Sequence, residues 1–151
     1  MNAIASKIRQ NTVLGRKMIT PEQLAKSNSE SGHAKALMCW AALNINQYPE
    51  LKWLAHIPNG GWRDAVTANN LKAEGVKAGL LDYFLAIKRG PYSGLWLELK
   101  RPGTKDKRVG VVSKDQEEWI DHLRSQGFVV VVCHGWEIAR NIIIGYLGSW
   151  K

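Results

Sequence analysis

Residues 80–100 constrain the fold more than any other part of the chain. Two apolar runs rich in aromatic and branched residues, Leu80–Lys88 and Leu95–Lys100, flank a Gly-, Pro- and Ser-containing segment at Gly90–Gly94. This pattern predicts a β-hairpin. Side chains alternate between the two faces of a strand, so the leucines of the second strand share one face. The other face carries three different residues: Trp96, Glu98 and Lys100.

A second consequence of the hairpin concerns its open end. Folding back about the turn brings Asp82 opposite Glu98 and Lys100. Two close carboxylates repel, and a partly buried one raises its pKa or binds a cation. A hard cation such as Mg²⁺ suits this pair, because it binds through one or two carboxylates and keeps several waters. A metal and an ammonium group are components of phosphodiester hydrolysis. The alternative is an ordinary Glu-x-Lys pair on an edge strand, with Asp82 at a turn.

Four motifs occur around this hairpin in a specific order. They are His56-Ile57-Pro58-Asn59-Gly60-Gly61, the run from Leu71 to Asp82, Glu98-Leu99-Lys100-Arg101-Pro102-Gly103, and Ser113-x-x-Gln116. Together they resemble the virus-type replication–repair nuclease (VRR-NUC) domain of the PD-(D/E)xK superfamily, in its small stand-alone phage-like form. The resemblance covers roughly Ser29 to Leu147. The chain departs from the family at Leu81, where a proline is usual; proline carries no chemistry there, so we expect the site to survive.

The resemblance implies a metal-dependent active site. Its expected catalytic residues are Asp82, Glu98, Lys100 and Gln116. Its expected ligands for Mg²⁺ or Mn²⁺ are Asp82, Glu98, the Leu99 backbone carbonyl and Glu30. Lys100 would position or activate the attacking water and offset negative charge, and Gln116 would orient Lys100 or that water. The implied attack is in line and leaves a 5′-phosphate.

Two of these residues have an alternative structural role. Glu30 lies at the expected start of a helix, where the helix dipole favours an acidic residue in any protein. Ser113-x-x-Gln116 is also the pattern of a helix capping box. The capping role and the catalytic role of Gln116 can coexist.

The charge of the chain points to a polyanionic partner. The net charge is +8 and the isoelectric point is about 9.7, which favours polyanions electrostatically or serves solubility alone. With a candidate phosphodiesterase centre in the same chain, DNA is the better explanation. The basic residues from Arg101 to Arg108 are either an ordinary solvated loop or a loop that tracks phosphates without reading sequence. The expected DNA contacts are Asn59, Arg63, Lys72, Lys77, Arg101, Lys105, Lys107, Arg108 and Ser113.

The chain of 151 residues suits one core. Residues 1–28 are expected to form a basic arm with a short helix that starts after Thr20 and ends near Lys26. Residues 29–151 are expected to form the VRR-NUC-like nuclease domain. The sequence contains no apolar run of the roughly 18–20 residues that a membrane span needs and no signal-peptide pattern. Cys39 and Cys133 are expected to be reduced core thiols, so we expect a cytoplasmic protein of a bacterial or phage-infected cell.

Periodicity predicts the remaining elements. Helices are expected at Ser29–Gln47, Asp64–Glu74, Lys114–Gln126 and Trp136–Tyr146, with His33 on the surface and Leu71 facing inward. Strands are expected at Leu51–Ile57 and Phe128–Cys133. The second is a continuous apolar run, typical of a central strand covered on both faces. The expected fold is α/β: a restriction-endonuclease-like mixed β-sheet flanked by helices on both faces.

The resemblance implies a structure-specific DNA endonuclease that resolves four-way (Holliday) junctions as a homodimer, because small stand-alone members of the family resemble dimeric enzymes that act on branched DNA. A two-fold dimer presents two centres to a two-fold substrate. One alternative is an inactive DNA-binding module, for which Leu81 is the only support in the sequence. Another is a flap nuclease or a restriction-type nuclease, although the chain has no spare recognition domain. Residues 142–147 are either a dimer surface or ordinary core.

Overall fold

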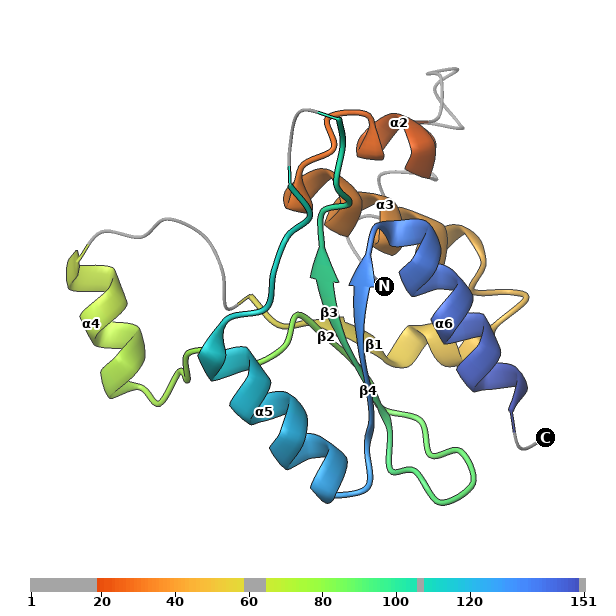
Figure 1. The fold of residues 1–151 in the computed structure, drawn as a ribbon. Helices are drawn as coiled ribbons and strands as arrows, with labels where there is room; N and C mark the ends of the chain where they lie inside the picture. The colour runs from red at the N-terminus through yellow and green to blue at the C-terminus, as the bar shows by residue number, and fades with distance from the viewer. Residues whose placement is uncertain (1–18, 59–64, 106–107, 150–151) are drawn as a thin grey trace.

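The protein, described by a computed structural model over residues 19–58, 65–105 and 108–149, is built on a four-stranded mixed sheet (Figure 1). The strands lie in the order β1 (Leu54–His56), β2 (Tyr83–Leu85), β3 (Leu95–Lys100) and β4 (Val129–His134). The first three pair antiparallel, and β4 pairs parallel with β3. The predicted hairpin is therefore present, with Tyr83 opposite Leu97.

Six helices lie in the part of the chain that the structure describes. They are α2 (Pro21–Ala25), α3 (Glu30–Leu43), the 3₁₀ helix η1 (Pro49–Trp53), α4 (Ala65–Ala73), α5 (Lys114–Ser125) and α6 (Trp136–Gly148). Ser29 caps α3 through the amide of Gly32, and Thr20 and Ser113 form capping boxes on α2 and α5. A serine or threonine oxygen satisfies an amide that the first turn leaves without a partner.

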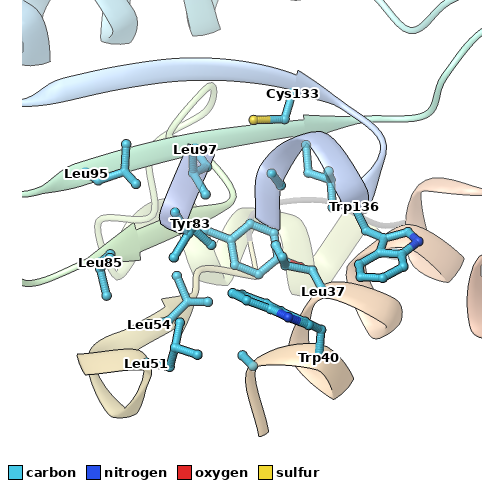
Figure 2. Close-up of a cluster of buried hydrophobic side chains, with 14 of the residues drawn as sticks. Leu37, Trp40, Leu51, Leu54, Tyr83, Leu85, Leu95, Leu97, Cys133 and Trp136 are labelled. Carbon is cyan, nitrogen blue, oxygen red and sulfur yellow. The ribbon is translucent and has the colours of Figure 1, made fainter. Parts of the chain in front are cut away.

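The main core lies on the leucine face of β3. Leu95 and Leu97 are completely buried there and pack with residues of α3 and α6. Figure 2 shows Tyr83 and Trp40 among these aliphatic side chains. Cys133 is also buried in this core, and Cys39 is buried elsewhere on α3, which confirms the predicted burial of both thiols.

A smaller core covers the opposite face of the sheet. It is made by Ile120 and Leu123 of α5, Val130 of β4 and the fully buried Leu81, with Trp96 packed against it. Because α3 and α6 cover one face and α5 the other, the predicted α/β fold with helices on both faces of a mixed sheet is confirmed.

Two predicted elements end differently. The strand expected at Leu51–Ile57 is a 3₁₀ helix followed by the three-residue β1. Leu51 and Leu54 are both buried at a helical spacing, whereas Trp53 is 55% exposed. Helix α3 stops at Leu43 rather than Gln47, because the Asn44 side chain bonds the carbonyl of Trp40 and ends the helix.

The first hairpin strand is also shorter than expected. It ends at Leu85 instead of Lys88, because the chain leaves the sheet and forms a separate bridge between Arg89 and Tyr92. The last strand, β4, lies at the edge of the described sheet and not at its centre. Its apolar residues are explained by helices on its two faces, and β3 is the strand with neighbours on both sides.

Two individual residues contradict the sequence interpretation. His33 is 5% exposed, not on the surface, because Asn28 and the Trp136 amide contact its two ring nitrogens. Leu71 is only half-buried and belongs to neither core, since α4 lies away from the sheet (Figure 1). None of the helices in the described part of the chain is long and apolar enough to cross a membrane.

Candidate active site

Asp82 is held at the start of β2 by bonds on both sides. Its backbone carbonyl accepts the Ile57 amide at 2.7 Å, and its side-chain Oδ2 accepts the Leu99 amide at 2.9 Å. The preceding residue, Leu81, is fully buried under α5. Leu81, at the position where the resemblance leads us to expect proline, thus anchors the chain in the smaller core. Asp82 reaches the end of β3 as the hairpin predicts.

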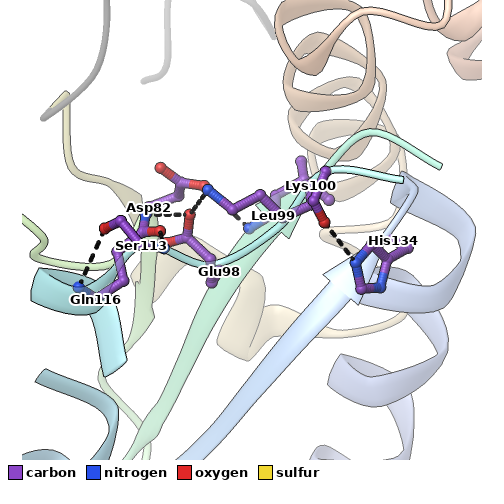
Figure 3. Close-up of polar contacts among 8 residues, drawn as sticks. Asp82, Glu98, Leu99, Lys100, Ser113, Gln116 and His134 are labelled. Carbon is purple, nitrogen blue, oxygen red and sulfur yellow. Dashed lines mark hydrogen bonds and ion pairs between the residues drawn. The ribbon is translucent and has the colours of Figure 1, made fainter. Parts of the chain in front are cut away.

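Glu98 is the most buried charged residue that the structure describes, at 1% exposure. Figure 3 shows its carboxylate among groups from three segments. Its Oε1 accepts hydrogen bonds from Lys100 Nζ at 2.7 Å and from Gln116 Nε2 at 2.5 Å. Its Oε2 is buried and has no hydrogen-bond partner within the protein. A buried carboxylate oxygen without a partner is costly, and a bound cation would satisfy it.

Gln116 combines its two expected roles. Its Oε1 accepts the Ser113 amide, and the Ser113 hydroxyl accepts the Gln116 amide, which completes the capping box at the start of α5. The side-chain nitrogen that remains donates to Glu98. The contact is therefore with the carboxylate, whereas the sequence interpretation placed it on Lys100 or a water. The capping box thus holds the side-chain amide of Gln116 in place, and this amide holds the Glu98 carboxylate.

The electrostatics of the pair favour a bound cation. Burial raises the pKa of Asp82 and of Glu98 above the ordinary carboxyl value, and the negative charge of Asp82 raises the pKa of Glu98 further. For Glu98 the hydrogen bond from Lys100 partly offsets this effect, and for Asp82 the Leu99 amide does so. A divalent cation would relieve both penalties at once.

The donor atoms fit Mg²⁺ or Mn²⁺. Asp82 and Glu98 supply hard oxygen ligands, which these ions prefer. The Leu99 amide points toward Asp82, and because a residue's N–H and C=O leave a strand on the same side, its carbonyl points there as well. In the described segments, no three His, Cys, Asp or Glu side chains form a metal cluster by themselves. Two carboxylates, a carbonyl and waters are the coordination that Mg²⁺ commonly takes.

Glu30 lies beside this site but is exposed on the first turn of α3. A Cβ placed on Gly110 would lie 3.5 Å from Glu30 Oε1 and 3.2 Å from the Cβ of Lys100. Glu30 also contributes, as the smallest cause, to the raised pKa of Asp82, which is mainly due to burial. The structure thus brings Glu30 near Lys100, outside any three-carboxylate cluster.

The comparisons with known proteins agree with this geometry. The family model of the VRR-NUC domain matches residues 21–137. The chain belongs to the VRR-NUC domain family. A solved structure described as a VRR_NUC domain protein is 28% identical to it, with a TM-score of 0.64, and the match covers 82% of this chain and 93% of that one. A search of curated proteins gives no match. The VRR-NUC domain is a nuclease-type domain, and its substrate is DNA.

The expected DNA contacts of this VRR-NUC domain divide into three groups. Exposed side chains within the described segments are those of Lys72, Lys77, Lys105, Arg108 and Ser113. Arg101 is half-buried, and its Nη1 is buried without a partner. The remaining predicted contacts lie outside the described residues: Asn59, Arg63 and Lys107. The described basic residues extend from the carboxylate pair along the loop after β3 and toward α4.

Sequence reasoning missed a clamp on the loop that leaves β3. His134, which pairs with Lys100 in the sheet register, has its Nε2 3.0 Å from the Gly110 carbonyl, and the Gly110 amide donates to Arg101. These contacts hold both ends of the loop over the stem of Lys100 in the VRR-NUC site. The only signal in the sequence was the polar residue His134 at the end of an apolar run.

A second missed group supports the other side of the same loop. His33 accepts the Trp136 amide at Nδ1, while Asn28, whose φ is +46°, bonds both His33 and the Pro102 carbonyl. Burial lowers the pKa of His33, so the neutral imidazole that can accept this bond is favoured. No local motif reveals this group, because its members are distant in sequence.

Proposed function

We propose that this protein is a Mg²⁺- or Mn²⁺-dependent, structure-specific DNA endonuclease that resolves four-way junctions as a homodimer. One observation carries the proposal. Glu98 has a buried, unpartnered oxygen, and Lys100 lies 2.7 Å from the other oxygen of the same carboxylate. A structural ion pair needs no free oxygen in the protein interior, whereas a metal site does.

The metal ligands in this proposal are Asp82, Glu98 and the Leu99 carbonyl, with Glu30 positioned to join when metal and DNA are present. The ion, when bound, would polarise a phosphate oxygen and neutralise charge that develops on it. Raised carboxyl pKa values in the metal-free state are consistent with this role, because they mark negative charge that the protein alone stabilises poorly.

Lys100 and Gln116 would prepare the reaction. Water attacks phosphorus in line and loses a proton to solvent as its P–O bond forms. The bond to the 3′ oxygen breaks on the other side, and that oxygen takes up a proton from solvent, which leaves a 5′-phosphate and a 3′-hydroxyl. The Lys100 ammonium orients that water and offsets charge in the transition state. Gln116 keeps Glu98 in place through its hydrogen bond to Oε1. Reacting groups need such fixed positions, because small displacements cost rate steeply.

The assembly proposal depends on the symmetry of the substrate. A four-way junction has two equivalent strands to cut, and a two-fold dimer provides one centre for each. The surface considered for this role at residues 142–147 is largely core, since Ile143, Tyr146 and Leu147 are buried. The dimer contact therefore has to be sought elsewhere, and cross-linking combined with mass spectrometry would locate it.

Cleavage of labelled four-way junction, flap and linear duplex tests the proposal. Each substrate is incubated with wild type, Asp82→Asn and Asp121→Asn in Mg²⁺, Mn²⁺ or EDTA. Asp121 is an exposed carboxylate on α5 with no contact to the pair, so its variant is a matched control.

We expect paired nicks on the junction that require metal, are absent in Asp82→Asn and persist in Asp121→Asn. If the flap is cleaved faster than the junction, the protein is still a nuclease, but its preferred substrate is a flap and not a four-way junction. Tight binding without cleavage by any of the proteins would contradict the enzymatic proposal.

A further inference from the structure

An open surface pocket of about 450 Å³ lies outside the carboxylate site, between α5 and the segment that follows α4. It is lined by Lys77, Ala78, Asp115, Glu118, Trp119 and His122. Its volume falls within the usual range of small-ligand pockets. The proposed reaction at the carboxylate pair uses none of these side chains. Lys77 alone has a role so far, as an expected contact to DNA phosphate.

The pocket has a fixed wall. Trp119 Nε1 donates to the Ala78 carbonyl at 3.0 Å, and this bond joins α5 to the segment before Asp82. Gly79, at φ +78°, lies so close that a Cβ there would be 2.5 Å from the carbonyl carbon of Asp115. Only glycine tolerates both this conformation and this contact. The pocket is therefore formed before any ligand arrives.

The pocket is next to the proposed reaction centre. Asp115 precedes Gln116, whose amide holds Glu98. With a helical rise of about 1.5 Å per residue, Trp119 lies about 4.5 Å and His122 about 9 Å further along α5 than Gln116. A nucleotide one or two positions from the scissile phosphate can reach this distance.

The lining selects one kind of occupant. Trp119 is half-exposed and meets His122 edge-on, with ring centroids 6.2 Å apart, so an aromatic surface for stacking is available. Asp115 and Glu118 accept hydrogen bonds from amino groups and repel phosphate. Lys77 supplies one cation at the rim for a flanking phosphate. A nucleobase with an amino group meets all three conditions, whereas a phosphate group does not.

We propose that this pocket binds an unpaired, amino-bearing nucleobase of the DNA strand that the enzyme cuts. The base must be unpaired, because pairing and stacking within a duplex cover the groups that the pocket contacts. This inference rests on the proposed nuclease function and gives it a source of structure specificity. The enzyme selects DNA in which a base beside the cleaved bond is free to leave the stack.

The test uses junctions in which single nucleotides near the cleaved bond are replaced, one at a time, by an abasic analogue. Wild type should lose about tenfold in kcat/KM at one position, the amount expected for loss of one stacked base. Glu118→Gln should be slower than wild type on the intact junction and equal to wild type on that abasic junction. Glu117→Gln, the matched control from the neighbouring exposed acid that does not line the pocket, should match wild type on both.

Two results would contradict the proposal that this pocket binds a nucleobase. One is equal cleavage by wild type of every abasic junction; the other is an equal loss for Glu118→Gln on intact and abasic DNA, which indicates a structural effect. A binding readout separates this inference from the nuclease proposal. In Asp82→Asn protein, 2-aminopurine at the critical position should be quenched, and Trp119→Phe should reduce the quenching. If the fluorescence of 2-aminopurine is quenched but wild type does not cleave the DNA, the pocket binds the base and the nuclease proposal is wrong.

Discussion

The two faces of β3 make opposite use of the same six residues. Leu95, Leu97 and Leu99 are buried among aliphatic and aromatic side chains, so that face contributes mainly hydrophobic stability. The other face carries Glu98 and Lys100, and burial opposes the charge of Glu98 there. The leucine face stabilises the fold. That stability allows the other face to keep the charged form of Glu98 buried, although burial disfavours it. The period-two alternation of a strand allows the two tasks to be separated by one residue.

The largest difference between the faces should appear in catalysis. Lys100→Met keeps the apolar stem and removes the ammonium, so cleavage should fall by roughly a thousandfold, as when a transition-state donor is removed. Glu98 would then be buried without its cation, which also lowers stability. The double variant Lys100→Met/Glu98→Gln should recover stability in urea unfolding and remain inactive in single-turnover cleavage. Near-normal cleavage by Lys100→Met would reject the catalytic assignment.

The leucine face should give the largest loss of stability. Leu97→Ala leaves a cavity in the main core and should lower the free energy of unfolding by about 2–5 kcal/mol. At a temperature where the variant stays folded, its cleavage rate should remain within a few-fold of wild type. The exposed Val111 provides the control, because Val111→Ala should change stability by less than about 0.5 kcal/mol. Loss of activity in fully folded Leu97→Ala would mean that the two faces are not separable.

The capping box allows a finer division. Ser113→Ala removes the hydroxyl cap of α5 and should cost about 1 kcal/mol of stability. Its cleavage rate should fall less than that of Gln116→Ala, because Gln116 Oε1 can still accept the Ser113 backbone amide. Gln116→Ala removes a cap group and the bond to Glu98, so its cleavage rate should fall by about tenfold or more. Urea unfolding and single-turnover cleavage on both variants check this. If the two variants lose rate equally, Gln116 acts only through the helix.

The pH dependence of stability should differ between the faces. Because the carboxyl pKa values of Asp82 and Glu98 are raised in the folded state, that state binds protons more tightly than the unfolded chain. This contribution to stability is present below the ordinary carboxyl pKa and is lost as pH rises through the raised values.

Urea unfolding in EDTA from pH 4 to 8 measures this effect. The difference in stability between Asp82→Asn/Glu98→Gln and wild type should increase with pH, whereas the difference for Leu97→Ala should be constant. A constant difference for the carboxylate variant as well would contradict the raised pKa values.

The smallest effect should come from the loop after β3. Replacing Lys105 and Arg108 by alanine should weaken DNA binding uniformly and reduce the salt slope of log K by roughly 2, one unit for each phosphate contact. Lys52 and Lys88, exposed at the other end of the hairpin, are the matched pair and should leave the slope unchanged. Equal slopes for both double variants would remove this loop from the DNA interface.

Local patterns predicted most of the candidate site. Alternation along β3 and the turn before it place Asp82 beside Glu98, and Ser113-x-x-Gln116 is a local capping motif, so both follow from neighbouring residues. Long-range packing decided the rest. The contact of Gln116 with Glu98 requires α5 to lie against the sheet, and the His134–Gly110 clamp joins residues that no local rule relates.

The same distinction explains the errors in the fold. The apolar residues around Leu51 suggest a strand, but Pro49 starts a 3₁₀ helix and only the helically spaced leucines are buried. The continuous apolar run of β4 indicates that both of its faces are covered by other elements. It does not indicate whether a strand pairs with each of its two edges, and β4 lies at the edge of the described sheet. Burial of a face can thus be predicted from sequence more readily than position in a sheet.

The most direct test of the central claim, that the polar face of β3 is a divalent-metal site, is a calorimetric titration of the protein with Mn²⁺ in the absence of DNA. Wild type and Asp121→Asn should bind Mn²⁺ with equal affinity, and Asp82→Asn and Glu98→Gln should each lose that binding. If both carboxylate variants bind Mn²⁺ as tightly as wild type, the ion does not bind between Asp82 and Glu98, and the account of Glu98 as a buried metal ligand is wrong.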